Sequence, residues 1–157
     1  MSDVFTKSKR SQVMSRIRAT GNKETELVLI RNFRANRIKG WRRHQPVFGK
    51  PDFVFSKHKL AVFVDGCFWH GCPRHANMPV GNRPFWQRKF NANKCRDRLV
   101  NKTLRARGWR VIRIWEHELK IEQKIILRIQ SAIKTQPRDI IKREVHKFDK
   151  NMIKPIG

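Results

Sequence analysis

Acidic residues are scarce in this chain of 157 residues: 12 Asp and Glu stand against 37 Lys and Arg, which gives a formal net charge of +25. A charge excess of this size destabilises the folded state by self-repulsion unless an anionic partner neutralises it. We therefore expect a polyanion, nucleic acid above all, as the binding partner. The few acidic residues become informative, because a surface that only binds phosphate has no use for them.

Long apolar runs and a targeting segment are also missing. No segment reaches the roughly eighteen consecutive apolar residues of a membrane-spanning helix, and neither a wide apolar helix face nor a signal peptide is visible. We therefore expect a cytoplasmic protein without a membrane partner. The 3 cysteines are too few for a disulfide scaffold, and two of them, Cys67 and Cys72, stand beside histidines. That arrangement favours a reducing compartment and a metal site.

The length predicts a single domain, with a basic arm at 1–20, a folded domain at 21–135 and a basic tail at 136–157. The run LAVFVD is apolar without alternation, which predicts a central strand covered on both faces. Caps, turns and apolar spacing predict the following elements: a helix over 22–37, antiparallel strands over 41–47, 52–56 and 60–65, a helix over 84–107, a strand over 109–115 and a helix over 118–134. This order describes an α/β fold, a mixed sheet flanked by helices.

The stretch FVDGCFWHGCPRHA has the composition of a metal site. Cys67, Cys72 and His75 place three of the four ligands of a tetrahedral zinc on one loop. His117 is the best candidate for the fourth ligand, because the strand before it is expected to lie beside the central strand. His70 is an alternative ligand, and two buried cysteines with unrelated histidines are the alternative to a metal.

Carboxylates and a histidine indicate hydrolytic chemistry. Asp52 begins a predicted strand, where aspartate has poor propensity. Asp97 lies on the apolar seam of the helix over 84–107 and needs a partner, such as a cation, a metal-bound water or His70. With Glu26 of the first helix, these groups fit a hydrated Mg²⁺ beside a polarised histidine, an arrangement for phosphodiester hydrolysis. Separately, each carboxylate has an ordinary explanation: a turn, a helix dipole or an ion pair with a neighbouring arginine.

Five motifs in this chain resemble one family of DNA repair nucleases. They are KSKRSQVMSRIRATGNKETE, GKPDFVF, FVDGCFWH, FWQRKFNANKCRDR and GWRVIRIWEHEL. In order and spacing they are similar to the very short patch repair endonucleases (Vsr), over roughly residues 2–120. The resemblance implies a restriction-endonuclease-like core, a structural Zn²⁺ and a catalytic Mg²⁺. It also implies a nick on the 5′ side of the thymine in T·G mismatches that arise from 5-methylcytosine deamination.

The resemblance further implies roles for individual residues. Asp52 would bind Mg²⁺ together with the backbone carbonyl of Val64, and His70 would act as the general base. Glu26 and Asp97 would hold metal-bound waters or orient the histidine. Aromatic side chains would enter the base stack beside the mismatch, where unstacking costs less than in paired DNA. This wedge would consist of Phe68, Trp69 and Trp86, with ordinary core packing as the alternative for the first two.

Two departures from the familiar family pattern concern the metal sites. Asp65 stands where a histidine is familiar, which adds an acid near the expected Mg²⁺. His117 replaces a cysteine, so the zinc set becomes two cysteines and two histidines. The expectation is a monomeric DNA mismatch endonuclease, with a mismatch-repair protein such as MutL as a further candidate partner. The alternatives are a restriction-type or phage nuclease that cuts paired DNA, and a zinc-stabilised DNA-binding protein without activity.

Overall fold

The centre of the fold is a small mixed sheet. The computed structural model describes residues 25–75 and 78–135, and the expected arm and tail lie outside these residues. The strand order is β1-β2-β3, with β1 antiparallel and β3 parallel to β2. The strands are β1 (Phe53–Phe55), β2 (Leu60–Asp65) and β3 (Arg110–Trp115). The sheet confirms the mixed α/β class and the central position of the strand over 60–65.

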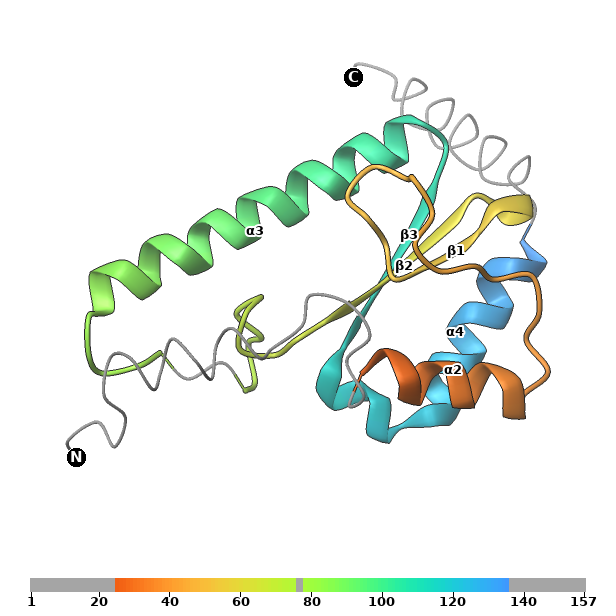
Figure 1. Cartoon of the computed structure of the whole chain (residues 1–157), viewed down its shortest axis with the longest axis horizontal. Coiled ribbons are helices and arrows are strands. Elements are labelled where there is room, and N and C mark those ends of the chain that lie inside the picture. Colours follow the sequence, from red (N-terminus) through yellow and green to blue (C-terminus); the bar gives the residue numbers. More distant parts are fainter. Residues whose placement is uncertain (1–24, 76–77, 136–157) are drawn as a thin grey trace, which may run out of the picture.

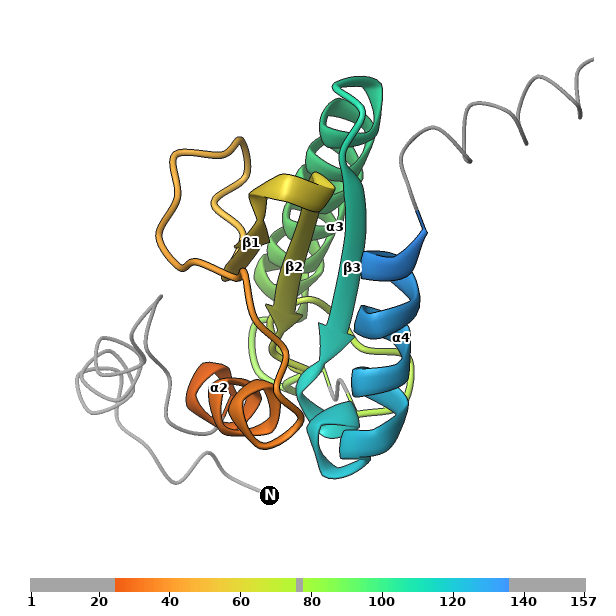
Figure 2. The same cartoon turned by 90° about the vertical axis from the view of Figure 1, so that its right-hand side faces the viewer.

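Helices cover both faces of this sheet (Figures 1 and 2). They are α2 (Glu26–Ala35), α3 (Arg83–Ala106) and α4 (Glu122–Lys134). Successive residues of β2 face opposite ways. Leu60 and Val62 pack in the apolar core that α2 and α4 complete, whereas Ala61 and Phe63 pack with residues of α3. The prediction that this strand is covered on both faces is therefore confirmed.

The strand predicted over 41–47 is wrong. Within this segment only Arg42 forms a bridge, to Val54 of β1, and bends and turns follow. His44 adopts a left-handed φ of 53°, and Pro46 has no N–H to donate, so neither residue can continue a regular ladder. The chain instead loops away from the edge of β1 before it returns to that strand.

The last predicted helix begins later than expected. Residues Glu116–Lys120 form a 3-10 helix, η2, and α4 follows it. Glu118, expected in the first turn of the α-helix, accepts the backbone N–H of Trp115 at 2.9 Å and a guanidinium N–H of Arg128 at 3.3 Å. These bonds cap the 3-10 turn, which delays the start of the α-helix.

α3 matches its prediction closely. Pro84 lies in its first turn, and Gly108 follows its end with a φ of 75°. Asn93 is buried on the apolar seam, and the Asp97 side chain is 18% exposed. The 24 residues span about 36 Å, so α3 extends past the sheet to the loop after β2 (Figure 1). Neither α3 nor any other described helix is long and apolar enough to cross a membrane.

The strand directions gather several segments at one edge of the sheet. β2 and β3 run parallel, so the loop after Asp65 and the 3-10 helix after Trp115 leave the sheet at the same edge. β1 runs the other way, so Asp52, which precedes it, lies at this edge as well. Three chain segments with polar side chains therefore converge there.

Candidate active site and metal centre

Two cysteines and two histidines come together at this edge. Cys67, Cys72 and His75 lie on the loop after β2, His117 lies in η2, and their ligand atoms are all within 4.8 Å of one another. The Sγ of Cys67 is 3.2 Å from Nδ1 of His117. The Sγ of Cys72 is 3.7 Å from that atom and 3.8 Å from Nδ1 of His75. A tetrahedral zinc with bonds of about 2.0–2.3 Å separates its ligand atoms by about 3.3–3.8 Å. This Cys–His cluster can therefore hold such an ion.

The loop that carries the cluster is held in place by its backbone, by η2 and by α3. The N–H of Cys72 donates to the carbonyl oxygen of Cys67 at 2.9 Å, and the N–H of Cys67 donates to Oε2 of Glu116 at 3.1 Å. From α3, Nδ2 of Asn93 donates to the carbonyl oxygen of Trp69 at 2.7 Å. This bond satisfies a polar side chain that is otherwise buried on the apolar seam of α3.

His70 lies between the two cysteines of the cluster but is not part of it. Its Nδ1 is 2.7 Å from Oδ2 of Asp97, and its side chain is 21% exposed. A bond from Nδ1–H to the carboxylate leaves Nε2 as the unprotonated nitrogen of the neutral ring. A general base requires this tautomer if Nε2 is to accept the proton. The alternative in which His70 is a fourth zinc ligand is not what the structure shows.

Arg113 of β3 joins Asp97 to a second carboxylate. Its Nη2 donates to Oδ1 of Asp97 at 3.0 Å, and its Nη1 donates to both carboxylate oxygens of Asp65 at 2.7 and 2.8 Å. Its Nε donates to Oδ1 of Asn101 at 3.1 Å. Burial raises the pKa of Asp65 above its usual range, although Arg113 and His70 lower it. The connected side chains form what we call the Arg113 network: Arg113, Asp65, Asp97, Asn101 and His70.

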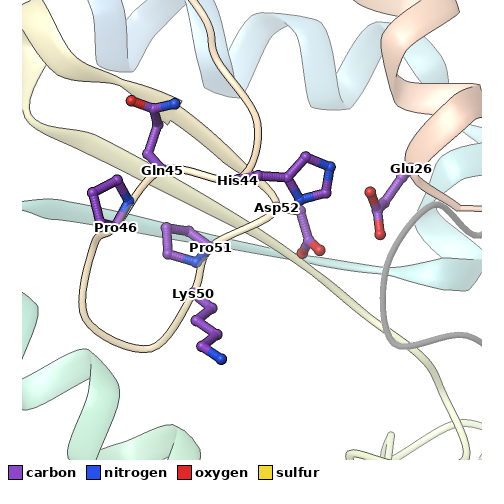
Figure 3. A pocket seen from close by; sticks show the side chains of 7 residues that line it. All are labelled: Glu26, His44, Gln45, Pro46, Lys50, Pro51 and Asp52. Carbon is purple, nitrogen blue, oxygen red and sulfur yellow. The ribbon is translucent and has the colours of Figure 1, made fainter.

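Asp52 lines a separate pocket of about 280 Å³ beside β1 (Figure 3). Its Oδ2 accepts the backbone N–H of Val64 at 2.7 Å, which ties the pocket to the end of β2. Glu26, 4% exposed, forms an ion pair with Arg43. We call this the Asp52 pocket; it is lined by Glu26, His44, Gln45, Pro46, Lys50, Pro51 and Asp52.

The electrostatics of the Asp52 pocket suit a divalent cation. Burial raises the pKa of Asp52 to about 6; the negative charges of Glu26 and Asp65 raise it as well, and the N–H of Val64 lowers it. A carboxylate that is costly to ionise beside other acids is stabilised by a bound cation with oxygen ligands. Glu26 and Asp52, predicted to act together, do line one pocket. The predicted role of the Val64 carbonyl stays a prediction.

The three predicted wedge residues form one aromatic cluster between the loop and α3. The ring centroid of Phe68 is 5.2 Å from that of Trp69 and 5.2 Å from that of Trp86. Phe90 adds a further contact to Phe68 at 5.4 Å. Trp86 is 8% exposed, and Phe68 and Trp69 are half-buried. The structure therefore groups these rings, and their entry into DNA stays a prediction.

Three loop residues in or beside the Asp52 pocket were not predicted from the sequence. Arg43, His44 and Lys50 all lie on the loop before β1. The strand predicted over 41–47 would have pointed Arg43 and His44 to opposite faces of the sheet, and Lys50 lay between two predicted strands. The two prolines and the glycine within RHQPVFGKP were the signal for a loop that folds back beside Asp52.

Comparison with known proteins identifies the family of this chain. Residues 2–76 match the family model described as DNA mismatch endonuclease Vsr. The type II nicking enzyme V.NaeI of Lentzea aerocolonigenes is 55% identical over 69 residues, which cover 44% of this chain and 42% of that protein. The type II nicking enzyme V.NmeAIP of Neisseria meningitidis is 41% identical over 123 residues, 76% of this chain and 86% of the relative. DNA mismatch endonuclease Vsr of Escherichia coli is 32% identical over 126 residues, 80% of each chain. The chain therefore belongs to the Vsr family of DNA mismatch endonucleases.

Proposed function

We propose that this protein is a Mg²⁺-dependent DNA endonuclease that nicks on the 5′ side of the thymine in T·G mismatches and so initiates very short patch repair. The observation that carries the proposal is the gathering of Asp52, His70 and Asp97 at one sheet edge in a chain of net charge +25. Carboxylates repel the DNA backbone, so a protein that only binds DNA gains nothing from them there. Membership of the Vsr family supports the endonuclease class.

The Asp52 pocket would hold the catalytic cation. When bound, Mg²⁺ supplies charge neutralisation at the phosphate and lowers the pKa of its water. Asp52 would be a ligand, together with the carbonyl of Val64, and Glu26 would hold a water of the ion's shell. The ion pair between Glu26 and Arg43 fixes the Glu26 carboxylate at the pocket wall. The donors are oxygen atoms, which Mg²⁺ prefers.

His70 would remove the proton from the attacking water. Nδ1 is engaged by Asp97, so Nε2 accepts the proton, and the Asp97 carboxylate stabilises the imidazolium that forms. The exposed part of the ring leaves it within reach of solvent and substrate. Asp97 thus acts on His70 rather than on the phosphate.

The Cys–His cluster would hold a structural Zn²⁺. Four protein ligands leave no open position for substrate, so the ion would fix the loop rather than take part in the chemistry. That loop carries His70 and two of the wedge rings, Phe68 and Trp69. The rings would unstack the weakened T·G step, while basic side chains supply salt-dependent contacts to phosphates. One chain holds every group that a nick requires, which supports action as a monomer.

The first test is cleavage of end-labelled duplexes with and without one T·G mismatch, with each strand labelled in turn and Mg²⁺ supplied or omitted. We expect a Mg²⁺-dependent nick in the thymine strand beside the mismatch. Cleavage of both strands of a paired duplex would contradict the proposal and favour a restriction-type nuclease. No cleavage in any sequence context would favour a metal-stabilised DNA-binding protein.

A matched pair of variants tests the assignment of the base. His70→Ala should lower kcat by about 10²–10⁴-fold, the usual contribution of a general base, with binding of the mismatched duplex nearly unchanged in a gel-shift assay. His58→Ala is the control, because His58 ends the 3-10 turn η1 (Ser56–His58) at the opposite edge of the sheet. If a folded His70→Ala protein loses DNA binding instead, the proposed role of His70 is wrong.

A further inference from the structure

Arg113 is a cation in the reaction centre whose donors are already occupied. Each of its three guanidinium nitrogens donates to a described side chain: Nη1 to Asp65, Nη2 to Asp97 and Nε to Asn101. Its Cζ lies 4.7 Å from the ring centroid of Phe63, so an aromatic side chain covers one face. The side chain is 19% exposed. A guanidinium bound in this way is suited to orienting other protein groups rather than to gripping DNA.

The contacts of Arg113 and His70 divide the carboxylate of Asp97 between them. Oδ2 of Asp97 binds Nδ1 of His70 at 2.7 Å, and Oδ1 accepts from Arg113 at 3.0 Å. A carboxylate held by a single hydrogen bond is free to rotate about its Cβ–Cγ bond, and the second bond to Arg113 removes that freedom. The plane of the Asp97 carboxylate therefore sets the direction of the imidazole.

Asp65 has a different relation to the same histidine. Its Oδ1 lies 3.7 Å from Nδ1 of His70, beyond hydrogen-bond range but close enough to compete with Asp97 after a small movement. One nitrogen of Arg113, Nη1, holds both oxygens of Asp65 at 2.7 and 2.8 Å in a charge-assisted contact. While that pair is intact, Asp65 is occupied and His70 has a single carboxylate partner.

We propose that Arg113 is a positioning residue for the general base: it locks Asp97 onto His70 and keeps Asp65 away from the histidine and from the metal. This inference rests on the function proposed above for His70. It assigns Asp65 the role of anchoring Arg113, which gives the extra acid near the Asp52 pocket a function.

Four variants separate positioning from a general structural or electrostatic role. Arg113→Met removes the charge and keeps the length of the side chain, and Arg113→Lys restores a charge that cannot bridge two carboxylates. Asp65→Asn with Arg113→Met removes both partners of the ion pair. Arg110→Met is the matched control: Arg110 lies on the same strand and donates to backbone carbonyls of His58 and Thr135 instead. It loses the same charge as Arg113→Met, so a general effect on DNA attraction is shared.

Nicking kinetics on the T·G duplex give the first readout. Arg113→Met should lose about 10- to 100-fold in kcat, as expected for a misoriented catalytic group, with KM within about twofold of the Arg110→Met value. Arg113→Lys should fall between wild type and Arg113→Met. The kcat of the double variant should exceed that of Arg113→Met alone, because the double variant leaves no unpaired Asp65 charge beside His70. Zinc content and Tm identify any variant that fails to fold, and the double variant is then the decisive one.

Imidazole nitrogen shifts give a second readout that does not depend on nicking. Long-range proton–nitrogen NMR spectra at a pH where His70 is neutral, assigned with His70→Ala, should show the Nδ1–H tautomer in wild type and in Arg110→Met. In Arg113→Met the two tautomers should mix. Wild-type kcat in Arg113→Met, a loss confined to KM, an equal loss in Arg110→Met, or an unchanged tautomer would each overturn the inference. If wild type fails to nick T·G duplexes, the proposed function fails, and the spectra still decide whether Arg113 orients His70.

Discussion

The Cys–His cluster and the Asp52 pocket lie at the same edge of the sheet, yet they are built for opposite purposes. The cluster offers two sulfur and two nitrogen atoms within 4.8 Å of one another, and both cysteines are buried. The Asp52 pocket offers carboxylate oxygens beside open space, with Lys50 and His44 on its lining. Soft ligands in a closed set suit a structural ion, whereas oxygen ligands at an open pocket suit an ion that meets substrate.

The comparison also shows an unequal dependence. His70 lies between Cys67 and Cys72, so the loop that the cluster fixes is the loop that delivers the general base. Asp52 directly precedes β1 and Glu26 begins α2, and both elements pack in the main apolar core without help from that loop. We therefore expect damage to the Cys–His cluster to displace His70 and so impair nicking, and damage to the Asp52 pocket to leave the cluster intact.

The largest effect should follow from breaking the cluster. Cys72→Ser should abolish stoichiometric zinc, lower the Tm and reduce nicking by about 10²–10⁴-fold, because the base on the freed loop is no longer held. Cys95→Ser is the control, since Cys95 is exposed on α3 and outside the cluster. Metal analysis, circular dichroism and nicking assays measure the three quantities. Full activity in a zinc-free Cys72→Ser protein would break the proposed dependence.

The next effect tests the converse. Asp52→Asn should reduce kcat by about 10²–10³-fold, through loss of a ligand to the catalytic ion, whose charge stabilisation is worth several kcal/mol. Zinc content should remain that of wild type. Glu122→Gln, an exposed change at the start of α4, is the charge-matched control. Loss of zinc from folded Asp52→Asn would show that the two sites are coupled in both directions.

A smaller effect concerns stability and pH. The folded pKa of Asp52, about 6, lies above the ordinary 3.8, so the folded protein binds this proton more tightly than the unfolded chain does. As pH rises from about 4 to 6, wild type should therefore lose about 1–3 kcal/mol of unfolding free energy relative to Asp52→Asn, with no further change above that window. Urea unfolding of both proteins in Mg²⁺-free buffer measures the difference. A difference that stays constant across this window would contradict the expected protonation of Asp52. Added Mg²⁺ should reduce the loss of unfolding free energy at the upper end of the window.

The smallest effect concerns the mouth of the Asp52 pocket. Lys50 has a φ of 52°, so Lys50→Gly removes the cation and keeps a backbone conformation that glycine adopts freely. We expect KM for the mismatched duplex to rise about threefold to tenfold, as for the loss of one phosphate contact, with little change in kcat. Lys59→Gly is the matched control, with a φ of 43° at the opposite edge of the sheet. Equal effects in both variants would mean that Lys50 contributes only to overall charge.

Local patterns predicted the Cys–His cluster well, because three of its members lie on one loop. The fourth, His117, follows from a strand order that the apolar run over 60–65 already indicated. The partner of Asp97 was harder, since several cations and His70 were all candidates. In the structure Asp97 contacts both His70 and Arg113. Arg113 is within reach because the register of β3 sets it opposite Phe63, on the face of the sheet that α3 covers. Sequence spacing does not determine such a register.

The loop residues that line the Asp52 pocket were missed for another physical reason. The segment over 41–47 has the aromatic and β-branched ends of a strand, and propensity alone cannot show that its middle turns back. Left-handed backbone at His44 and Lys50 produces that turn. Histidine and lysine do not indicate a left-handed conformation from sequence. A glycine would have indicated such a backbone. The loop has one at Gly49 alone, where an added Cβ would lie 2.4 Å from Val100.

The separation of the zinc ligands along the chain has a consequence for the order of assembly. His117 follows Cys67 by 50 positions, and it reaches the other three ligands only after β3 has paired with β2. Three ligands on one unpaired loop would bind zinc weakly and exchange it with solvent, so tight metal uptake should be a late event that reports a finished sheet. Bound zinc would then report correct folding. A chain that retains it already has the pairing of β3 with β2 that places Arg113 against Asp97, the partner of His70.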